Sequence, residues 1–322
     1  MSSARQRSRV LGLGSGAFLF AVMVTLVGCG PGSEDEAAPK RTDTHVPRLT
    51  NANSQEMPLD EYLLNPEQTE TVFSAYSASV ASCMREYGFT YRMSTSSYSG
   101  IGADAPKTRV DGRFGFQSMA HAKKWGYRPD GGFPDGERQS TGPAPDADKW
   151  FALTGTRDLS EDAGSGGVAQ DGRRVRGGGC VGDALLEITG SRNGVIGDAE
   201  AATDLKFKTL VEGQQDMRTL EVFGLWSRCM KGYHYSYRSP LEALGDVRWA
   251  KSKEPTDVEI GTAVADQKCR SRHNVVGVWF AADFERQELA VKANRKKLLE
   301  VKEQLIRQVR AAEQIIKKSK TE

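Results

Sequence analysis

The feature that most constrains this fold is an eleven-residue stretch that occurs twice. It runs from Ser82 to Arg92 and again from Arg228 to Arg238. Five of the eleven positions are identical and three are conservative replacements. Chance rarely gives so many matches, so we expect two related structural units. Each copy carries a cysteine at the equivalent place, Cys83 in the first and Cys229 in the second.

The N-terminus has the pattern of a bacterial lipoprotein signal peptide over residues 1–28. Three arginines precede an apolar stretch over 10–27, and this stretch ends in Leu26-Val27-Gly28-Cys29, which matches a lipobox. We expect Cys29 to be lipidated and to become the mature N-terminus, on the outer face of the cytoplasmic membrane. The alternative is a simple transmembrane anchor, because 18 largely apolar residues almost span a bilayer.

The composition limits the kinds of partner. Removal of the leader leaves 294 residues, enough for one large domain or two small ones. The leader holds three Arg and no acid, so the net charge of +2 becomes about −1 in the mature chain. A dedicated nucleic-acid-binding protein is strongly basic, so we expect no nucleic-acid partner.

The four cysteines other than Cys29 are Cys83, Cys180, Cys229 and Cys269. An even number outside the cytoplasm is typical of disulfides. Three pairings are open, and the repeat favours Cys83–Cys180 and Cys229–Cys269, because each unit then closes on itself. The spacing contains no C-x-x-C and no nearby His pair, so we expect no zinc site and no cofactor.

Helical periodicity dominates the rest of the chain, so we predict a mainly α fold with two related helical units, each closed by a disulfide. We expect the organisation to be a flexible tether over 29–56, a first unit with a long loop insertion over 57–196, a second unit over 197–275, and a basic C-terminal helix over 276–322.

Local signals place several helix ends. Asn65 before Pro66 predicts a helix start, and Gly88 predicts the left-handed residue that ends this helix. Thr256 and Glu259 match a capping box.

We expect one long helix from Asp198 or Thr203 to about Lys231, and another from Val276 to about Lys318 with near-heptad apolar spacing, as in a coiled coil. Asn294 and Gln308 interrupt its apolar seam. The stretches 129–145 and 160–172 read as surface loops.

Several motifs occur in an order that resembles a group of actinobacterial secreted proteins and lipoproteins of unknown function. They are Pro58-Leu-Asp-Glu-Tyr-Leu, the Cys-Met-Arg start of the repeat, Trp125-Gly-Tyr, Leu153-Thr-Gly, Gly178-Gly-Cys, Trp226 before Cys-Met, and Ala265-Asp266 to Trp279. The resemblance implies an extracytoplasmic setting and supports the disulfides. It implies no catalytic residues.

Candidate chemistry is sparse. A Cys180–His121 pair would serve as nucleophile and base only if Cys180 were a free thiol. Asp158, Glu161 and Asp162 would suggest a carboxylate pair for glycan cleavage, but solvated charge in a loop is the commoner case.

Aromatic residues near the repeats are better candidates for a binding surface for sugar rings or a peptide, although such residues more commonly form the core beside a disulfide. They are Tyr91, Trp125, Tyr127, Tyr235 and Tyr237. The alternation at 233, 235 and 237 would place three tyrosines on one face of a strand.

The C-terminal helix is the second candidate surface. From Glu285 onward the chain has 11 basic and 6 acidic residues. Its charge would suit contact with an anionic cell-wall polymer or lipid headgroups, but a plain solvated face, or a helix packed back on the domain or on a protein partner, is the commoner case.

Together these features favour a non-catalytic binding or scaffolding lipoprotein of the cell envelope. The alternatives are a cell-wall-active hydrolase and a solute-binding lipoprotein of an importer. The latter fold needs repeated βαβ units, whereas this sequence predicts helices and loops.

The cysteine pattern gives a first prediction. The mature protein, alkylated without reduction and weighed intact, should contain no alkylated thiol, because Cys29 is lipidated and the other four cysteines are paired. An alkylated Cys180 would contradict the pairing and reopen the enzyme hypothesis.

Overall fold

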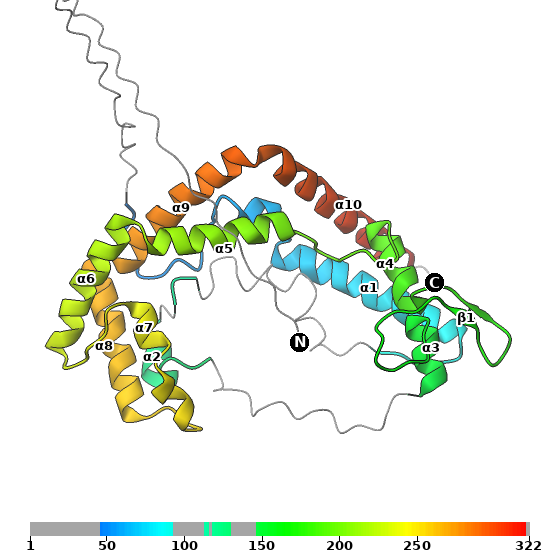
Figure 1. Cartoon of the computed structure of the whole chain (residues 1–322), viewed down its shortest axis with the longest axis horizontal. Coiled ribbons are helices and arrows are strands. Elements are labelled where there is room, and N and C mark those ends of the chain that lie inside the picture. Colours follow the sequence, from blue (N-terminus) through cyan, green and yellow to red (C-terminus); the bar gives the residue numbers. More distant parts are fainter. Residues whose placement is uncertain (1–45, 93–112, 116–117, 130–145, 320–322) are drawn as a thin grey trace, which may run out of the picture. The chain divides into compact units, whose positions relative to one another are not determined.

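The computed structural model describes residues 46–92, 113–115, 118–129 and 146–319, so the predicted leader, Cys29 and most of the tether lie outside it. Within these residues the prediction of a mainly helical fold is confirmed (Figure 1). The described strands form one antiparallel hairpin, β1 (Gly167–Val168) with β2 (Arg174–Val175). No helix in the described ranges is long and apolar enough to cross a membrane.

The first hydrophobic core surrounds the helix that carries the first repeat copy, and Val72, Val80 and Met84 of this helix are fully buried in it. Asn65 caps the helix, and its side chain and that of Gln68 complete a capping box. The elements of this core are the short η1 (Asp60–Tyr62), α1 (Pro66–Glu86), α3 (Ala147–Thr154), α4 (Gly179–Thr189) and α10 (Arg295–Ser319), and the first turns of α5 add Ala202 and Leu205.

The second core is built around two fully buried tryptophans, Trp226 and Trp279. Phe114 and Phe223 each meet the ring of Trp279 edge to face. Its elements are α2 (Met119–Trp125), α6 (Met217–Gly232), α7 (Pro240–Leu244), η3 (Val247–Lys251), α8 (Asp257–His273) and α9 (Val275–Ala293), while α5 (Glu200–Gln214) packs along α9.

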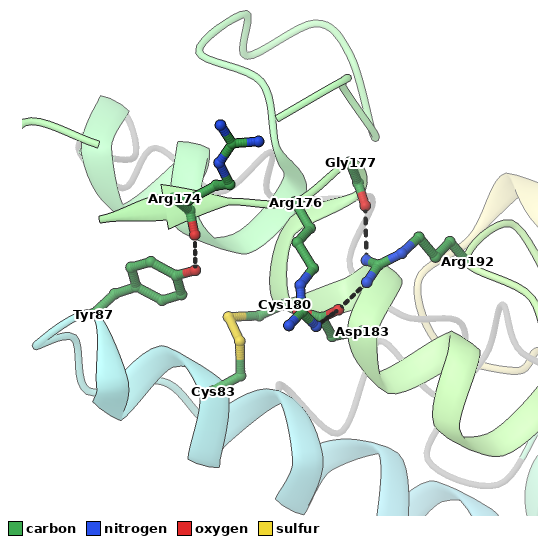
Figure 2. Close-up of a disulfide and its surroundings, with 8 residues drawn as sticks. All are labelled: Cys83, Tyr87, Arg174, Arg176, Gly177, Cys180, Asp183 and Arg192. Atoms are coloured by element: carbon green, nitrogen blue, oxygen red, sulfur yellow. Dashed lines mark hydrogen bonds and ion pairs between the residues drawn. A yellow bond between two sulfur atoms is a disulfide. The ribbon is translucent and has the colours of Figure 1, made fainter. Parts of the chain in front are cut away.

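Each core is closed by one disulfide, in the pairing that the repeat favoured. Cys83 of α1 is bonded to Cys180 of α4, and Cys229 of α6 is bonded to Cys269 of α8. Figure 2 shows the first bond, beside which the Tyr87 hydroxyl donates to the backbone oxygen of Arg174 (2.9 Å). The bonds close loops of 97 and 40 residues, and in the chain-entropy model each stabilises the fold by about 4 kcal/mol.

The two repeat copies form the same helix end. After α1, the backbone N–H of Phe89 donates to Met84 O (2.9 Å), and after α6 that of Tyr235 donates to Met230 O (3.0 Å). The residue before each donor is left-handed, Gly88 with φ 80° and His234 with φ 67°. The repeat is therefore a repeated helix-terminating turn.

The two cores do not follow the boundaries predicted from the sequence. Residues 46–56, predicted as the end of the tether, belong to the described fold, and Ala52 is buried in the second core. Met57, predicted as the start of the first unit, is buried in the second core as well. Phe114 and Tyr127, predicted in the insertion of the first unit, also belong to the second core, and α2 packs against α8. The chain therefore passes repeatedly between the cores.

Both long helices expected from the periodicity are interrupted. Asp216 ends the first one, because its carboxylate caps the new helix α6 by accepting from the backbone N–H of Arg218. Asn294 separates α9 from α10, and its side-chain amide donates to Ala290 O (2.8 Å). Short polar side chains compete in this way for the backbone groups of a helix.

A closed ring of buried polar groups joins the elements of the two cores. Lys206 of α5 donates to Asp60 of η1 (3.0 Å), and the backbone oxygen of Lys206 accepts from Arg113 (2.8 Å). Arg113 forms a two-point ion pair with Asp283 of α9.

Gln287 completes this ring, because its amide donates to Asp283 and its oxygen accepts from the backbone N–H of Leu59 (3.1 Å). Two cations and two carboxylates leave the ring neutral. α5 approaches α9 closely here, since a Cβ on Gly213 would lie 3.1 Å from Asp283 Cβ.

The matched turns give a stability prediction. His234→Gly should raise the free energy of unfolding by about 1 kcal/mol, because glycine accepts the left-handed backbone without steric cost. Gly88→Ala should lower it by about the same amount, although the space beside Gly88 is open. Urea denaturation of the oxidised protein measures both. Destabilisation by His234→Gly would show that the imidazole, rather than the backbone turn, matters at this place.

Candidate functional site

The five candidate aromatic residues are divided between the two cores. Tyr91 is half-buried against the first core, whereas Tyr127 and Tyr237 are buried in the second and Tyr235 packs against it. Trp125 is half-buried, with the Lys124 ammonium 4.9 Å from its ring centre. The structure thus does not bring these side chains together in one groove.

The Tyr237 hydroxyl has two hydrogen-bond partners. The hydroxyl donates to Asp246 (2.8 Å) and accepts from Arg248 (2.7 Å). Burial, together with the adjacent carboxylate, raises the pKa of Tyr237 to about 12. The expected strand is not present at 233–237, because the left-handed turn at His234 interrupts the alternation.

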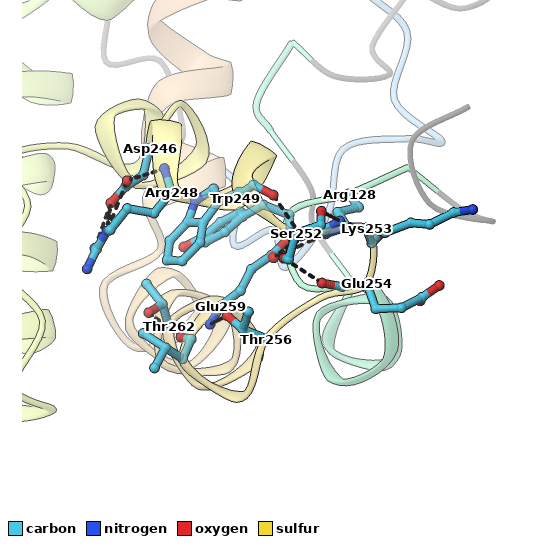
Figure 3. Close-up of polar contacts among 12 residues, drawn as sticks. Arg128, Asp246, Arg248, Trp249, Ser252, Lys253, Glu254, Thr256, Glu259 and Thr262 are labelled. Carbon is cyan, nitrogen blue, oxygen red and sulfur yellow. Dashed lines mark hydrogen bonds and ion pairs between the residues drawn. The ribbon is translucent and has the colours of Figure 1, made fainter. Parts of the chain in front are cut away.

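Arg128 and Glu259 form the most complete polar site of the second core (Figure 3). Both side chains are fully buried, and Arg128 donates to both carboxylate oxygens of Glu259. Arg128 also donates to the backbone oxygens of Trp249, Ser252 and Lys253, at 2.7–2.8 Å.

Residues next to Arg128 and Glu259 also take part in this buried polar site. Glu259 accepts from the backbone N–H of Tyr127 (3.2 Å), and the Tyr127 ring stacks on Trp249. Burial raises the pKa of Tyr127. The guanidinium is thus committed to the chain that connects η3 to α8, and the site holds this connection rather than a ligand.

The sequence did not predict the site of Arg128 and Glu259. The capping-box motif of Thr256 and Glu259 predicted a different partner for the Glu259 carboxylate. Thr256 does cap α8 by accepting from the backbone N–H of Glu259 (3.2 Å). The capping box is only half formed, however, because the Glu259 carboxylate turns to Arg128 instead of the N-cap backbone. A buried partner 131 residues away is invisible to a local motif.

The structure does not assemble the catalytic candidates. Cys180 is bonded to Cys83 in the first core, whereas His121 contacts the backbone oxygen of Arg128 (2.6 Å) in the second. Hydrogen bonds from Ser160 lower the pKa of Asp158, which is the opposite of what a general acid requires.

The other carboxylates give no ligand site. Glu161 accepts from the Thr156 hydroxyl (2.9 Å). In the described part of the chain, no three His, Cys, Asp or Glu side chains are placed to hold a metal ion together.

The C-terminal helix packs back on the domain through its apolar seam, which decides between the alternatives that the sequence left open. Leu298, Leu305, Ala312 and Ile315 are buried against the first core. Gln308, expected to interrupt the seam, is also buried, where it accepts from the Gly197 N–H (2.8 Å) and donates to Val195 O (3.1 Å). The apolar seam of α10 is therefore occupied by contacts with the rest of the fold.

The outward face of α10 and the end of α9 is basic. Between Lys292 and Lys318 the chain has nine Lys or Arg against three Glu. Lys302 is committed to Glu61 on η1 (2.6 Å). We call the following exposed residues the outer basic face: Lys292, Arg295, Lys296, Lys297, Arg307, Arg310 and Lys317. Arg307 meets Glu303 only at 4.0 Å, which contributes little in solvent.

Comparisons with known proteins add no relative. No family model matches this chain, and neither the search of curated proteins nor that of solved structures gave a match. The resemblance to actinobacterial secreted proteins stays a prediction.

The environment of Tyr237 gives a prediction that separates a structural from a binding role. Tyr237→Phe should lower the free energy of unfolding by about 1 kcal/mol, because Asp246 and Arg248 lose a shared partner. In the wild-type protein the pKa of Tyr237 is raised. The contribution of its neutral hydroxyl to the free energy of unfolding is therefore complete below pH 10 and is lost as the pH rises through about 12.

Ultraviolet titration of tyrosinate measures this effect, with Tyr235→Phe as the control. The Tyr237→Phe variant should lose one tyrosine from the step near pH 12. A loss from the step near pH 10 would show that Tyr237 is open to solvent.

Proposed function

We propose that the chain is a cell-envelope lipoprotein, anchored in the outer face of the cytoplasmic membrane through Cys29, with a non-catalytic ectodomain. In this proposal the ectodomain binds an anionic cell-wall polymer through the outer basic face. The observation that carries it is the use of the two faces of α10, one sealed against the first core and the other left basic and exposed.

The extracytoplasmic setting is supported by the cysteines. Four of the five are paired in two disulfides, which persist in oxidising compartments. The fifth, Cys29, follows the apolar leader in a lipobox. Several acyl chains on one residue hold a soluble domain at a membrane, whereas one chain binds only marginally.

A binding role is supported by the way the chain uses its charges. The most deeply buried ionic groups are committed to partners inside the cores, as in the pairs Arg128–Glu259 and Lys206–Asp60. The charged groups that remain available to an external molecule are therefore those on the surface. The outer basic face concentrates charge of one sign, which attracts polyanions and weakens in salt.

The test is sedimentation of the mature protein with purified cell walls, before and after removal of their anionic polymers. Lys296→Gln, Arg310→Gln and Lys317→Gln combined should weaken wall binding about tenfold, because three exposed charges are lost. The matched control removes three cations from the first core's surface, Arg157→Gln, Arg174→Gln and Arg176→Gln. Salt should weaken wild-type binding.

Equal binding by both triple variants, or undiminished binding to walls stripped of their polymers, would reject the outer basic face as the binding surface. In cells, a labelled fatty acid should be incorporated into the wild-type chain and not into Cys29→Ser. Absence of label from the wild-type chain would reject the lipid anchor.

A further inference from the structure

A second group of cations surrounds the disulfide between α6 and α8. The Arg272 guanidinium lies 3.9 Å from Cys229 Sγ, and the Lys268 ammonium lies 5.5 Å from the centre of the Tyr233 ring. We call Arg228, Lys268, Arg272 and His273 the second-disulfide patch. The first three are exposed and His273 is half-buried. Both α6 and α8 end beside this patch.

The charge of the second-disulfide patch is not compensated by nearby acids. In the described ranges, no ion pair involves Arg228, Lys268 or Arg272. Partial burial and the positive charges of Arg272 and Arg228 lower the pKa of His273, as expected where cations are crowded together. The ends of α6 and α8 offer about half a negative charge each, which is less than the three permanent cations.

Other arginines of the same core that are exposed or half-buried are paired with carboxylates. Arg218 pairs with Glu285 (2.7 Å), Arg238 with Glu242 (3.3 Å) and Arg248 with Asp246 (2.6 Å). An uncompensated patch among paired neighbours has the chemistry of a surface that meets an external anion.

The N-terminal chain joins the domain at this patch. Asn274, which directly follows His273, donates to Pro47 O (2.9 Å) and accepts from the Leu49 N–H (3.0 Å). The exposed Arg48 lies between these two contacts and adds a further cation. Only 16 residues lie between Cys29 and Val46, a span of at most about 60 Å.

We propose that the second-disulfide patch, together with Arg48, rests on anionic phospholipid headgroups of the bilayer in which Cys29 is anchored. This inference rests on the lipid anchor of the proposed function and adds an orientation to it. The anchor holds the patch near the bilayer at high effective concentration. Each Lys or Arg at an anionic surface then strengthens membrane partitioning roughly fivefold.

The outer basic face lies apart from the second-disulfide patch along α9. α9 is 19 residues long, so the start of α10 lies about 28 Å along the helix from Asn274. This is more than three Debye lengths at physiological salt, so the two basic surfaces act independently. One surface would meet lipid and the other the wall polymer.

The experiment uses the oxidised mature chain with Cys29→Ser, so that no lipid contributes to binding. Vesicles of phosphatidylcholine are compared with vesicles in which about a third of the lipid is phosphatidylglycerol, by co-sedimentation. We expect binding to the anionic vesicles only. Arg228→Gln with Arg272→Gln should weaken this binding about 25-fold, from two losses of about fivefold each.

Arg174→Gln with Arg176→Gln is the matched control and should bind within about twofold of the parent chain. Circular dichroism and the alkylation assay verify the fold of each variant. If the Arg228 and Arg272 variant misfolds, Arg48→Gln with Lys268→Gln provides the same loss of charge.

Equal binding to both kinds of vesicle, or equal weakening by patch and control variants, would overturn the inference. Vesicle binding that is lost only in the Lys296, Arg310 and Lys317 variant would move the lipid contact to α10. These outcomes are separate from failure of the proposed function, because the vesicle assay requires neither lipidation of Cys29 nor binding to cell walls.

Discussion

The structure depends on the neutral ring of Asp60, Lys206, Arg113, Asp283 and Gln287. Its members come from η1, α5, α9 and the insertion, and residues 170 positions apart meet in it. Desolvation offsets much of the attraction in a buried ion pair, so the ring's contribution is specificity more than net stability. A register shift of α5 on α9 would leave buried charges unpaired, at a cost of about 3–5 kcal/mol for each broken pair. The ring therefore fixes how the elements of the two disulfide-closed cores pack against one another.

This arrangement explains which features the sequence revealed. Local signals gave correct helix ends at Asn65, Gly88 and Thr256, because a cap or a left-handed residue acts within one turn. The duplicated turn gave the disulfide pairing by symmetry. The breaks at Asp216 and Asn294 were missed, because apolar periodicity continues across a short polar interruption.

The rest required contacts that no local pattern contains. Arg128 and Tyr127 were assigned to the first unit. Tyr127 is nevertheless buried in the second core, and Arg128 pairs there with Glu259, 131 residues away. The candidate aromatic residues were chosen for their type, and the structure divides them between two cores. The residues of the second-disulfide patch are scattered along the sequence, and they come together only where the disulfide joins α6 and α8.

The central claim is that the buried ring joins the two cores, each closed by its own disulfide, into one unit that unfolds cooperatively. Native-state hydrogen exchange of the oxidised mature chain tests this most directly, by comparing amides in the middle of α1 with those in the middle of α6. We predict that the slowest amides of both helices open with the same free energy and the same dependence on denaturant. Two distinct opening free energies, with the cores unfolding one after the other, would contradict the account.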